Sequence, residues 1–258
     1  PQPKTAAHFD RLRTEIIPEL RRATALGKQR GTAQAALLLG DIVWDSPELF
    51  AGVREQFASL GIPVYGVIGN HDHDRNKYTD REATENYRNH FGPTYYAFDM
   101  GRTHYIVLDD IVYHGAKKYD EQIDSLQLAW AAEYARRLPA GSRVCVAMHA
   151  PAMKAWKGNQ VMESAARLMD AFAEGLGHYE QTHKVLILTT QVTYEGSDVG
   201  VYEVGKRVKN RFRFLEAHDM TIEAVVTKSM WLLAQNCDSF DQLQQRFYRQ
   251  VNFDTFYH

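Results

Sequence analysis

Two short polar blocks, each directly after an apolar run, place the strongest constraint on how this chain can fold. The first block, residues 40–45 (GDIVWD), follows the run Ala35–Leu39. The second, residues 69–74 (GNHDHD), follows the run Val64–Ile68. Apolar runs this short that end in glycine predict buried parallel strands.

The segment between the two runs has the period of a helix. Phe50, Val53, Phe57 and Leu60 fall on one face. Ser46 and Pro47 are typical of a helix start, and Gly61 is typical of a stop. The unit is therefore predicted to be strand–helix–strand. Both polar blocks then lie at the carboxyl ends of neighbouring strands, where open α/β sheets hold their ligands.

The side chains in these blocks are metal-ligand types. Asp41 offers a carboxylate and Asn70 an amide carbonyl, and a third apolar run, Arg143–Met148, ends at His149. Each residue alone also suits a turn or a cap. All three follow the end of a predicted strand, and this shared position favours one common site. The three side chains suit zinc or a divalent transition metal.

These residues carry a resemblance to a known family. Gly40-Asp41 with Asp45, then Gly69-Asn70-His71-Asp72, then His149, resemble the calcineurin-like metallophosphoesterases. The chain most resembles a bacterial branch in which the catalytic domain is followed by a separate C-terminal domain. The segments 91–98 (FGPTYYAF) and 104–110 (HYIVLDD) also resemble that branch, and the resemblance covers about residues 1–155.

The resemblance implies a fold and a chemistry. The fold is α/β, a layered sandwich of two mixed β-sheets flanked by helices. The activity is hydrolysis of a phosphodiester or phosphomonoester by a water activated on divalent metal ions such as Mn, Fe or Zn, two of them about 3.5–4 Å apart in the family. Asp41, Asn70 and His149 would bind metal. His71 would protonate the leaving oxygen without binding metal, and Asp45 would orient His71.

Two motifs depart from the family pattern. The first family motif is often Asp-Pro-Gln in this branch; Pro1-Gln2 fits its last two positions and predicts an Asp immediately before Pro1. The last motif should supply two histidines after a strand, but Gln191 and Thr193 stand there, after the predicted strand Lys184–Thr189. The remaining ligands predict one metal rather than two, because Gln and Thr are poor substitutes for imidazole.

Other patterns predict the remaining elements of the chain. Residues 94–100 and 103–109 predict a β-hairpin around Gly101-Arg102. The charged stretch 74–90 predicts a loop with one helical turn at most. A helix is predicted around Phe9 to Ala23, kinked at Pro18 and closed by Gly27.

A second group of helices is predicted farther along the chain. Leu126, Trp130, Tyr134 and Leu138 form a helical stripe that predicts a core-facing surface. Asp238 or Ser239 predicts the cap of a final helix that carries Phe240, Leu243, Phe247 and Val251. The catalytic domain is predicted over residues 1–198, and 199–258 is either its closing part or a small appended unit.

Composition and net charge limit the classes of binding partner and substrate that are expected. The formal net charge is −2 and the pI about 6.7, so no electrostatic footprint for nucleic acid is present, and a nuclease of this fold is disfavoured. No apolar run reaches membrane-spanning length. The expected substrate is a small-molecule or lipid phosphate ester. The oligomeric state and the compartment (soluble in the cytoplasm, the periplasm or outside the cell) stay open.

The altered last motif motivates a second hypothesis about the function. The fold would persist with a degraded metal site and serve as a binding or scaffold protein. Metal analysis together with a chromogenic phosphoester assay separates this reading from the enzyme.

Overall fold

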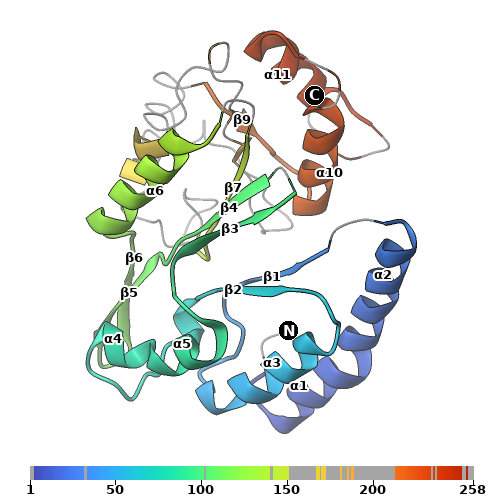
Figure 1. Ribbon diagram of the computed structural model, residues 1–258. Coiled ribbons are helices and arrows are strands. Elements are labelled where there is room, and N and C mark those ends of the chain that lie inside the picture. The colour runs from blue at the N-terminus through green and yellow to red at the C-terminus, as the bar shows by residue number, and fades with distance from the viewer. Residues whose placement is uncertain are drawn as a thin grey trace. The chain divides into compact units, whose positions relative to one another are not determined.

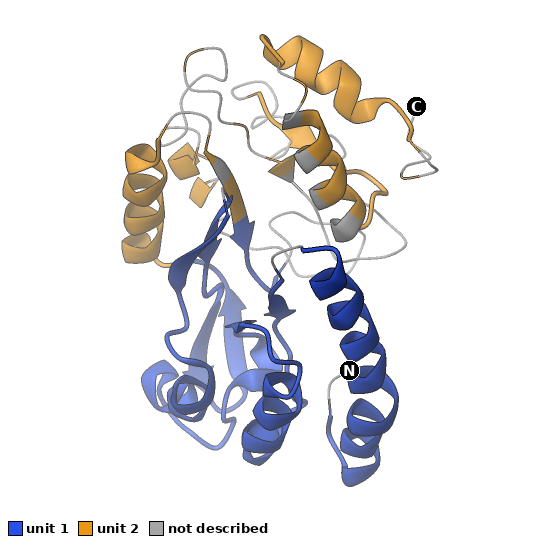
Figure 2. Cartoon of the chain, turned by 45° about the vertical axis from the view of Figure 1, so that its right-hand side comes forward, with its two compact units in different colours: residues 1–123, 146–150 blue, residues 124–145, 151–258 orange. Residues whose placement is uncertain are grey.

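The computed structural model describes most of the N-terminal half and parts of the C-terminal half of the chain. The described residues are 3–31, 34–101, 103–139, 142–150, 167–168, 170–172, 181, 185, 187–188, 213–233, 235, 237–251 and 254. The chain divides into two compact units (Figure 2), which are described separately. Unit 1 is residues 1–123 and 146–150; unit 2 is residues 124–145 and 151–258. The boundary predicted at residue 198 stays a prediction.

Unit 1 begins with a helix that is interrupted by one π-helical turn. The segments are α1 (Ala6–Arg11), η1 (Leu12–Ile16) and α2 (Ile17–Gln29), seen in Figure 1. The N–H of Ile17 donates to the carbonyl of Leu12, which makes the wider turn, and Pro18, which has no N–H, enters α2 directly after it. The predicted stop at Gly27 is wrong, because α2 continues to Gln29 and is closed by the N–H of Arg30.

The predicted strand–helix–strand unit is confirmed. β1 (Ala36–Leu39) pairs in parallel with β2 (Val64–Val67), with Ala36 opposite Val64. Between them lie η2 (Pro47–Leu49) and α3 (Phe50–Ala58). The four apolar side chains predicted to face inward, Phe50, Val53, Phe57 and Leu60, are buried.

The alternation of side chains along β1 separates two apolar layers. Leu38 packs with the helices, whereas Leu37 and Leu39 pack toward the other strands. The helix-side layer contains Leu12, Ile17, Ile42, Val43, Phe50, Val53, Phe57, Leu60, Ile68 and Tyr87. The strand-side layer contains Val67, Val107 and Ala147, with Leu37, Leu39, Tyr96 and Phe98 against them.

A second sheet supplies the other side of the strand-side layer. β3 (Tyr96–Met100) and β4 (Thr103–Val107) form the predicted antiparallel hairpin. β7 (Arg143–Ala147) lies next to β4 in the sheet order β3-β4-β7. The ring of Phe98 stacks on Tyr65 of β2, with the ring centroids 3.5 Å apart, so these aromatics pack between sheets, as expected.

The prediction of a loop over 74–90 is wrong. The structure has α4 (Asp80–Ala83) and α5 (Glu85–Phe91), and Thr79 caps α4 by accepting the N–H of Glu82. Most of the charged side chains are exposed, while Ala83 and Tyr87 are fully buried. The short helices were hidden because the polar residues outnumber the buried ones.

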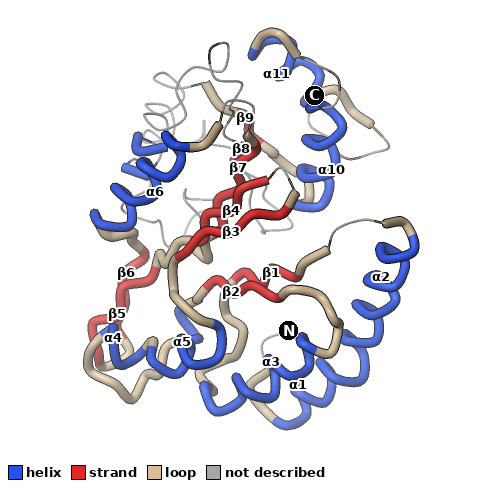
Figure 3. The backbone as a smooth tube through the Cα atoms, viewed as in Figure 1, coloured by secondary structure: helices blue, strands red, loops and turns tan. Residues whose placement is uncertain are grey.

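Sequence patterns also missed a hairpin. β5 (Ile111–Gly115) pairs with β6 (Lys118–Glu121) in an antiparallel ribbon, drawn as red tube in Figure 3. The turn residues Ala116 and Lys117 have φ of 48° and 66°.

Unit 2 has its own small core. The predicted helix is confirmed as α6 (Ser125–Arg137), but its predicted core-facing surface is wrong. Leu128, Ala131 and Ala135 are buried, whereas Leu126 is 73% exposed. β8 (Ile187–Leu188) pairs in parallel with β9 (Leu215–Glu216).

The described C-terminal residues of unit 2 form two helices. They are α10 (Ile222–Leu233) and α11 (Phe240–Tyr248). Ser239 caps α11 as predicted, by accepting the N–H of Gln242. Phe240, Leu243 and Phe247 are buried in the core of this unit.

The fold class predicted from sequence, α/β, is confirmed by this mixture of parallel and antiparallel strands with helices. Within the described residues, no helix is long and apolar enough to cross a membrane.

Candidate active site

The first polar block turns sharply at both of its carboxylates. Asp41 and Asp45 have φ of 49° and 51°, in the left-handed region that L residues other than Asn and Asp rarely adopt. Gly40 before them has φ 82°. Two non-glycine residues with positive φ this close together are uncommon, and such sparsely populated conformations concentrate at functional sites.

Asp72 joins the two polar blocks. It ends the short turn η3 (Asn70–Asp72). Its Oδ1 accepts the N–H of Val43 at 3.0 Å, and its Oδ2 accepts the N–H of Gly69 at 2.9 Å. Burial raises the pKa of Asp72 to about 7, although the two N–H donors lower it. Asp72 is therefore a structural link between the blocks.

Asp41, Asn70 and His149 meet, as the sequence predicted. His149 Nε2 lies 3.1 Å from Asn70 Oδ1 and 3.3 Å from Asp41 Oδ1. The side chains of Asp41 and His149 are 11% and 14% exposed, so the cluster is largely screened from water. Among the described residues no three His, Cys, Asp or Glu side chains form a metal-binding group, so this cluster depends on the amide of Asn70 as its third donor.

The protonation of His149 makes this cluster suitable for a cation. His149 Nδ1 lies 3.0 Å from the carbonyl oxygen of Leu39, which only accepts, so Nδ1 carries the hydrogen. In the neutral ring, Nε2 then presents a lone pair to two oxygens. Ligand atoms about 2.1 Å from a cation lie about 3.0 Å apart in an octahedron and about 3.4 Å apart in a tetrahedron. The observed separations fall in this range, so the residues fit a divalent cation.

Two glycines make the close approach possible. A Cβ on Gly40 would collide with the imidazole of His149, and a Cβ on Gly69 would collide with the backbone and carboxylate of Asp41. The His149 loop is fixed from behind by Asp110, whose two carboxylate oxygens accept the N–H groups of His149 and Ala150. Burial holds the pKa of Asp110 well above its usual range.

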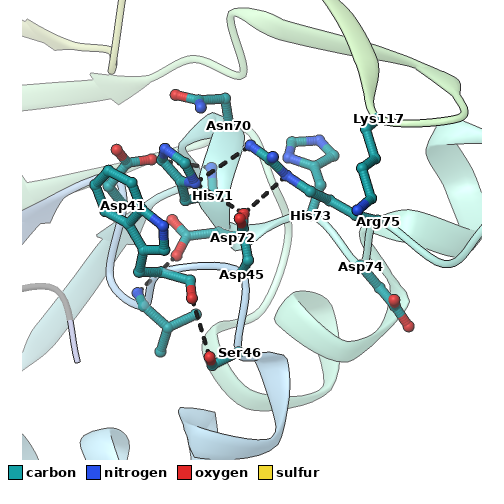
Figure 4. Close-up of polar contacts among 12 residues, drawn as sticks. Asp41, Asp45, Ser46, Asn70, His71, Asp72, His73, Asp74, Arg75 and Lys117 are labelled. Carbon is teal, nitrogen blue, oxygen red and sulfur yellow. Dashed lines mark hydrogen bonds and ion pairs between the residues drawn. The ribbon is translucent and has the colours of Figure 1, made fainter. Parts of the chain in front are cut away.

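His71 and Asp45 form the second part of the site (Figure 4). His71 Nδ1 lies 2.7 Å from Asp45 Oδ1, and the N–H of Asp45 donates to the carbonyl of His71 at 3.1 Å. The indole of Trp44 stacks on the imidazole, with centroids 3.9 Å apart. The N–H of His71 donates to Asp41 Oδ1, which connects this pair to the candidate metal ligands.

Sequence reasoning missed three residues beside these groups. Arg75 Nε contacts Asp45 Oδ1 at 2.7 Å. Tyr119 and Glu121 share the less exposed face of β6, since the alternating residues Lys118 and Asp120 are exposed. One oxygen of Glu121 is buried and has no hydrogen-bond partner among the described residues.

Electrostatics places this face of β6 near the site. Burial raises the pKa of Glu121, and the nearby His149 lowers it. Burial raises the pKa of Tyr119, as do the carboxylates of Glu121, Asp41 and Asp45, while Arg75 lowers it. The sequence signal for these residues is the alternation over 118–121, which is too short to identify a strand before its pairing with β5 is known.

The departures from the family pattern fall outside the described residues. Pro1, Gln2, Gln191 and Thr193 all lie there. The structure therefore describes the donors Asp41, Asn70 and His149, and the prediction of one metal rather than two stays a prediction.

Two comparisons with known proteins bear on identity. The chain is 44% identical over 55 residues to an L-asparaginase of Thermococcus kodakarensis; this covers 21% of the chain and 16% of that protein. The family model described as calcineurin-like phosphoesterase matches residues 7–175, well over half of the chain. This match contains every candidate ligand and the His71–Asp45 pair, and it ends before residues 191 and 193. The chain belongs to the calcineurin-like phosphoesterase family.

Proposed function

We propose that this protein hydrolyses phosphate monoesters or diesters of small molecules or lipids, with His71 as the proton donor to the leaving group. Membership of the family supports metal-dependent phosphoester hydrolysis in general. The observation that most supports the role of His71 is that Asp41 connects the candidate metal ligands with the His71–Asp45 pair. Asp41 contacts His149 through its side chain and accepts the N–H of His71.

Asp41, Asn70 and His149 are the residues that would hold a divalent cation. Such a cation, when bound, supplies positive charge to phosphoryl oxygens and lowers the pKa of a coordinated water. The chain prepares this position by fixing the tautomer of His149 through Leu39 and the loop through Asp110.

His71 is arranged to give a proton in one direction. Its Nδ1 hydrogen is directed at Asp45, so Nε2 on the opposite edge of the ring is the atom that meets substrate. In the hydrolysis, a water oxygen bonds to phosphorus, the ester P–O bond breaks, and the leaving oxygen takes the Nε2 proton. The proton that the attacking water gives up passes to solvent, from which Nε2 is protonated again. The ring keeps its Nδ1 hydrogen toward Asp45. A general acid of this kind contributes about 10²–10⁴-fold.

A binding or scaffold role with a degraded metal site remains the alternative. It is favoured by Gln191 and Thr193, which stand where the family has histidines. Under this alternative the fold is retained without turnover.

The test is an assay of the whole chain after metal removal and reloading with Mn²⁺, Zn²⁺ or Fe²⁺. The substrates are p-nitrophenyl phosphate and bis-p-nitrophenyl phosphate. We expect metal-dependent turnover of at least one ester, and we expect His71→Ala to lower kcat by about 10²-fold or more with metal content unchanged. A folded, metal-loaded chain that hydrolyses neither ester would support the scaffold reading. Turnover that survives His71→Ala would refute the role of His71.

A further inference from the structure

Arg75 and His71 both contact the same carboxylate oxygen of Asp45. Arg75 Nε lies 2.7 Å from Asp45 Oδ1, the same oxygen that lies 2.7 Å from His71 Nδ1. The guanidinium Nη2 lies 3.2 Å from His71 Nδ1. Figure 4 shows the three side chains meeting, with dashed contacts that converge on Asp45.

The hydrogens available decide what each contact means. Guanidinium nitrogens only donate, and the carboxylate only accepts. When His71 Nδ1 carries its hydrogen toward Asp45, Nη2 cannot donate to Nδ1 and simply lies against the edge of the ring. The strong contact of Arg75 is therefore the charge-assisted hydrogen bond from Nε to Asp45.

Asp45 needs this second partner. Its side chain is 32% exposed, so packing restrains the carboxylate only in part. The His71 hydrogen alone leaves the carboxylate free to turn about its terminal bond. Two donors on Oδ1 that approach from different residues fix its position.

Arg75 is itself held from behind. The buried Tyr113 on β5 donates its hydroxyl hydrogen to the carbonyl of Arg75 at 3.0 Å. The same hydroxyl accepts the N–H of Lys117 in the hairpin turn at 3.1 Å. The Arg75 side chain is 22% exposed, whereas Arg11 and Arg22 in surface ion pairs are 70% and 76% exposed. The hairpin missed by sequence reasoning thus anchors the arginine.

We propose that Arg75 is a positioning residue, which fixes the Asp45 carboxylate so that His71 presents its Nε2 hydrogen to the leaving oxygen. This inference rests on the proposed function and adds a residue to it. Arg75 acts through proton donation by His71, so its loss must lower turnover more for esters with poor leaving groups than for esters with good ones. The contact to Asp45 comes from Nε, which is part of a planar guanidinium that a lysine ammonium does not reproduce, so lysine does not replace Arg75.

The test uses the full chain loaded with Mn²⁺ and two aryl phosphates, 2,4-dinitrophenyl phosphate and phenyl phosphate. In Arg75→Ala we expect kcat for the phenyl ester to fall about 10-fold or more beyond the loss for the dinitrophenyl ester, because only the poor leaving group depends on the acid. KM and the metal content should stay near the wild-type values. Added guanidinium, far below denaturing concentrations, should restore part of the kcat of Arg75→Ala but not that of Asp45→Ala. Arg75→Lys should remain impaired.

Arg54→Ala is the matched control. Arg54 is an exposed arginine on α3, outside the candidate site, and this variant should match the wild type with and without guanidinium. Arg75→Ala with a raised KM and equal losses for both esters would overturn the inference and make Arg75 a phosphate-binding group instead. Equal kinetics for Arg75→Ala and wild type would also overturn it. A wild-type chain that hydrolyses neither these two monoesters nor bis-p-nitrophenyl phosphate with any metal refutes the proposed function itself, and the inference with it.

Discussion

His149 Nε2 lies 3.3 Å from Asp41 Oδ1, although one residue follows β7 and the other follows β1. The hydrogen of His149 is committed to Leu39 on its other nitrogen. When the imidazole is neutral, the facing atoms Nε2 and Oδ1 both carry lone pairs and repel each other. A cation between them removes this repulsion.

Removal of the Asp45 side chain should impair turnover without loss of metal. Asp45→Ala deletes the partner of His71 Nδ1, and we expect kcat to fall about 10- to 100-fold because the ring loses its orientation. Asp45→Asn, which keeps an acceptor oxygen and tolerates the left-handed backbone, should lose less. Steady-state kinetics with metal analysis of both variants checks this. Loss of metal from Asp45→Ala would place Asp45 among the ligands instead.

Gly40→Ala should damage the site beyond its cost in backbone strain. The new Cβ collides with the His149 imidazole, and φ at this position is 82°. We expect about 1–2 kcal/mol of strain and a metal affinity about 10-fold weaker or worse because His149 is displaced. Gly31→Ala is the control, since φ there is 68° and nothing lies within 4 Å. It should lose similar stability but no metal affinity; equal metal affinity in both variants would contradict the predicted displacement.

Asp72 should make the metal-free protein less stable as pH rises from about 4 to 7. Its ordinary pKa is 3.8 and its folded-state pKa is about 7, so between these values the folded chain holds a proton that the unfolded chain has released. The free energy of unfolding should therefore fall with rising pH, by roughly 1.4 kcal/mol per pH unit from this group alone.

The check is urea unfolding of EDTA-treated protein across this pH range. Asp72→Asn cannot titrate and should show a shallower decrease than the wild type. The buried Asp109 and Asp110, whose pKa values are also raised, act in both proteins and cancel in the comparison. Identical slopes would show that Asp72 is already ionised in the folded state.

Two tyrosines on opposite sides of Gly66 give a matched pair for stability. The hydroxyl of Tyr87 is buried and has no hydrogen-bond partner among the described residues, while that of Tyr96 donates to the carbonyl of Gly66 at 2.9 Å and accepts its N–H at 3.0 Å. We expect Tyr87→Phe to stabilise the fold by about 1 kcal/mol and Tyr96→Phe to destabilise it by about 1 kcal/mol or more. Thermal unfolding checks the signs, and a destabilised Tyr87→Phe would reveal a hidden partner of its hydroxyl.

The core of the site was predictable because strand ends fix position. Parallel strands β1 and β2 carry their polar blocks to one edge, so Asp41 and Asn70 had to lie close together once the strands were identified. His149 followed from the same rule for β7. The glycines that open each block also carried information, since Gly40 and Gly69 leave the space that His149 and Asp41 occupy.

The surroundings of the site were not predictable in the same way. Arg75 lies in a charged stretch whose helices are short, so no periodic pattern distinguished it from solvated charge. Tyr119 and Glu121 lie on a four-residue strand that becomes recognisable only when paired with β5. The face of α6 was assigned to Leu126 and Trp130, but packing selects the small residues Ala131 and Ala135.

The most direct test of the account is metal binding to the whole chain, measured by calorimetry with Mn²⁺ or Zn²⁺ after EDTA treatment. We predict that the wild type binds a divalent cation, and that His149→Ala and Asn70→Ala each weaken binding about 10-fold or more. The side chain of His71 lies outside the ligand set, so His71→Ala should fold and bind the cation as the wild type does. A wild type that binds no divalent cation, or unchanged affinity in both His149→Ala and Asn70→Ala, would contradict the central claim.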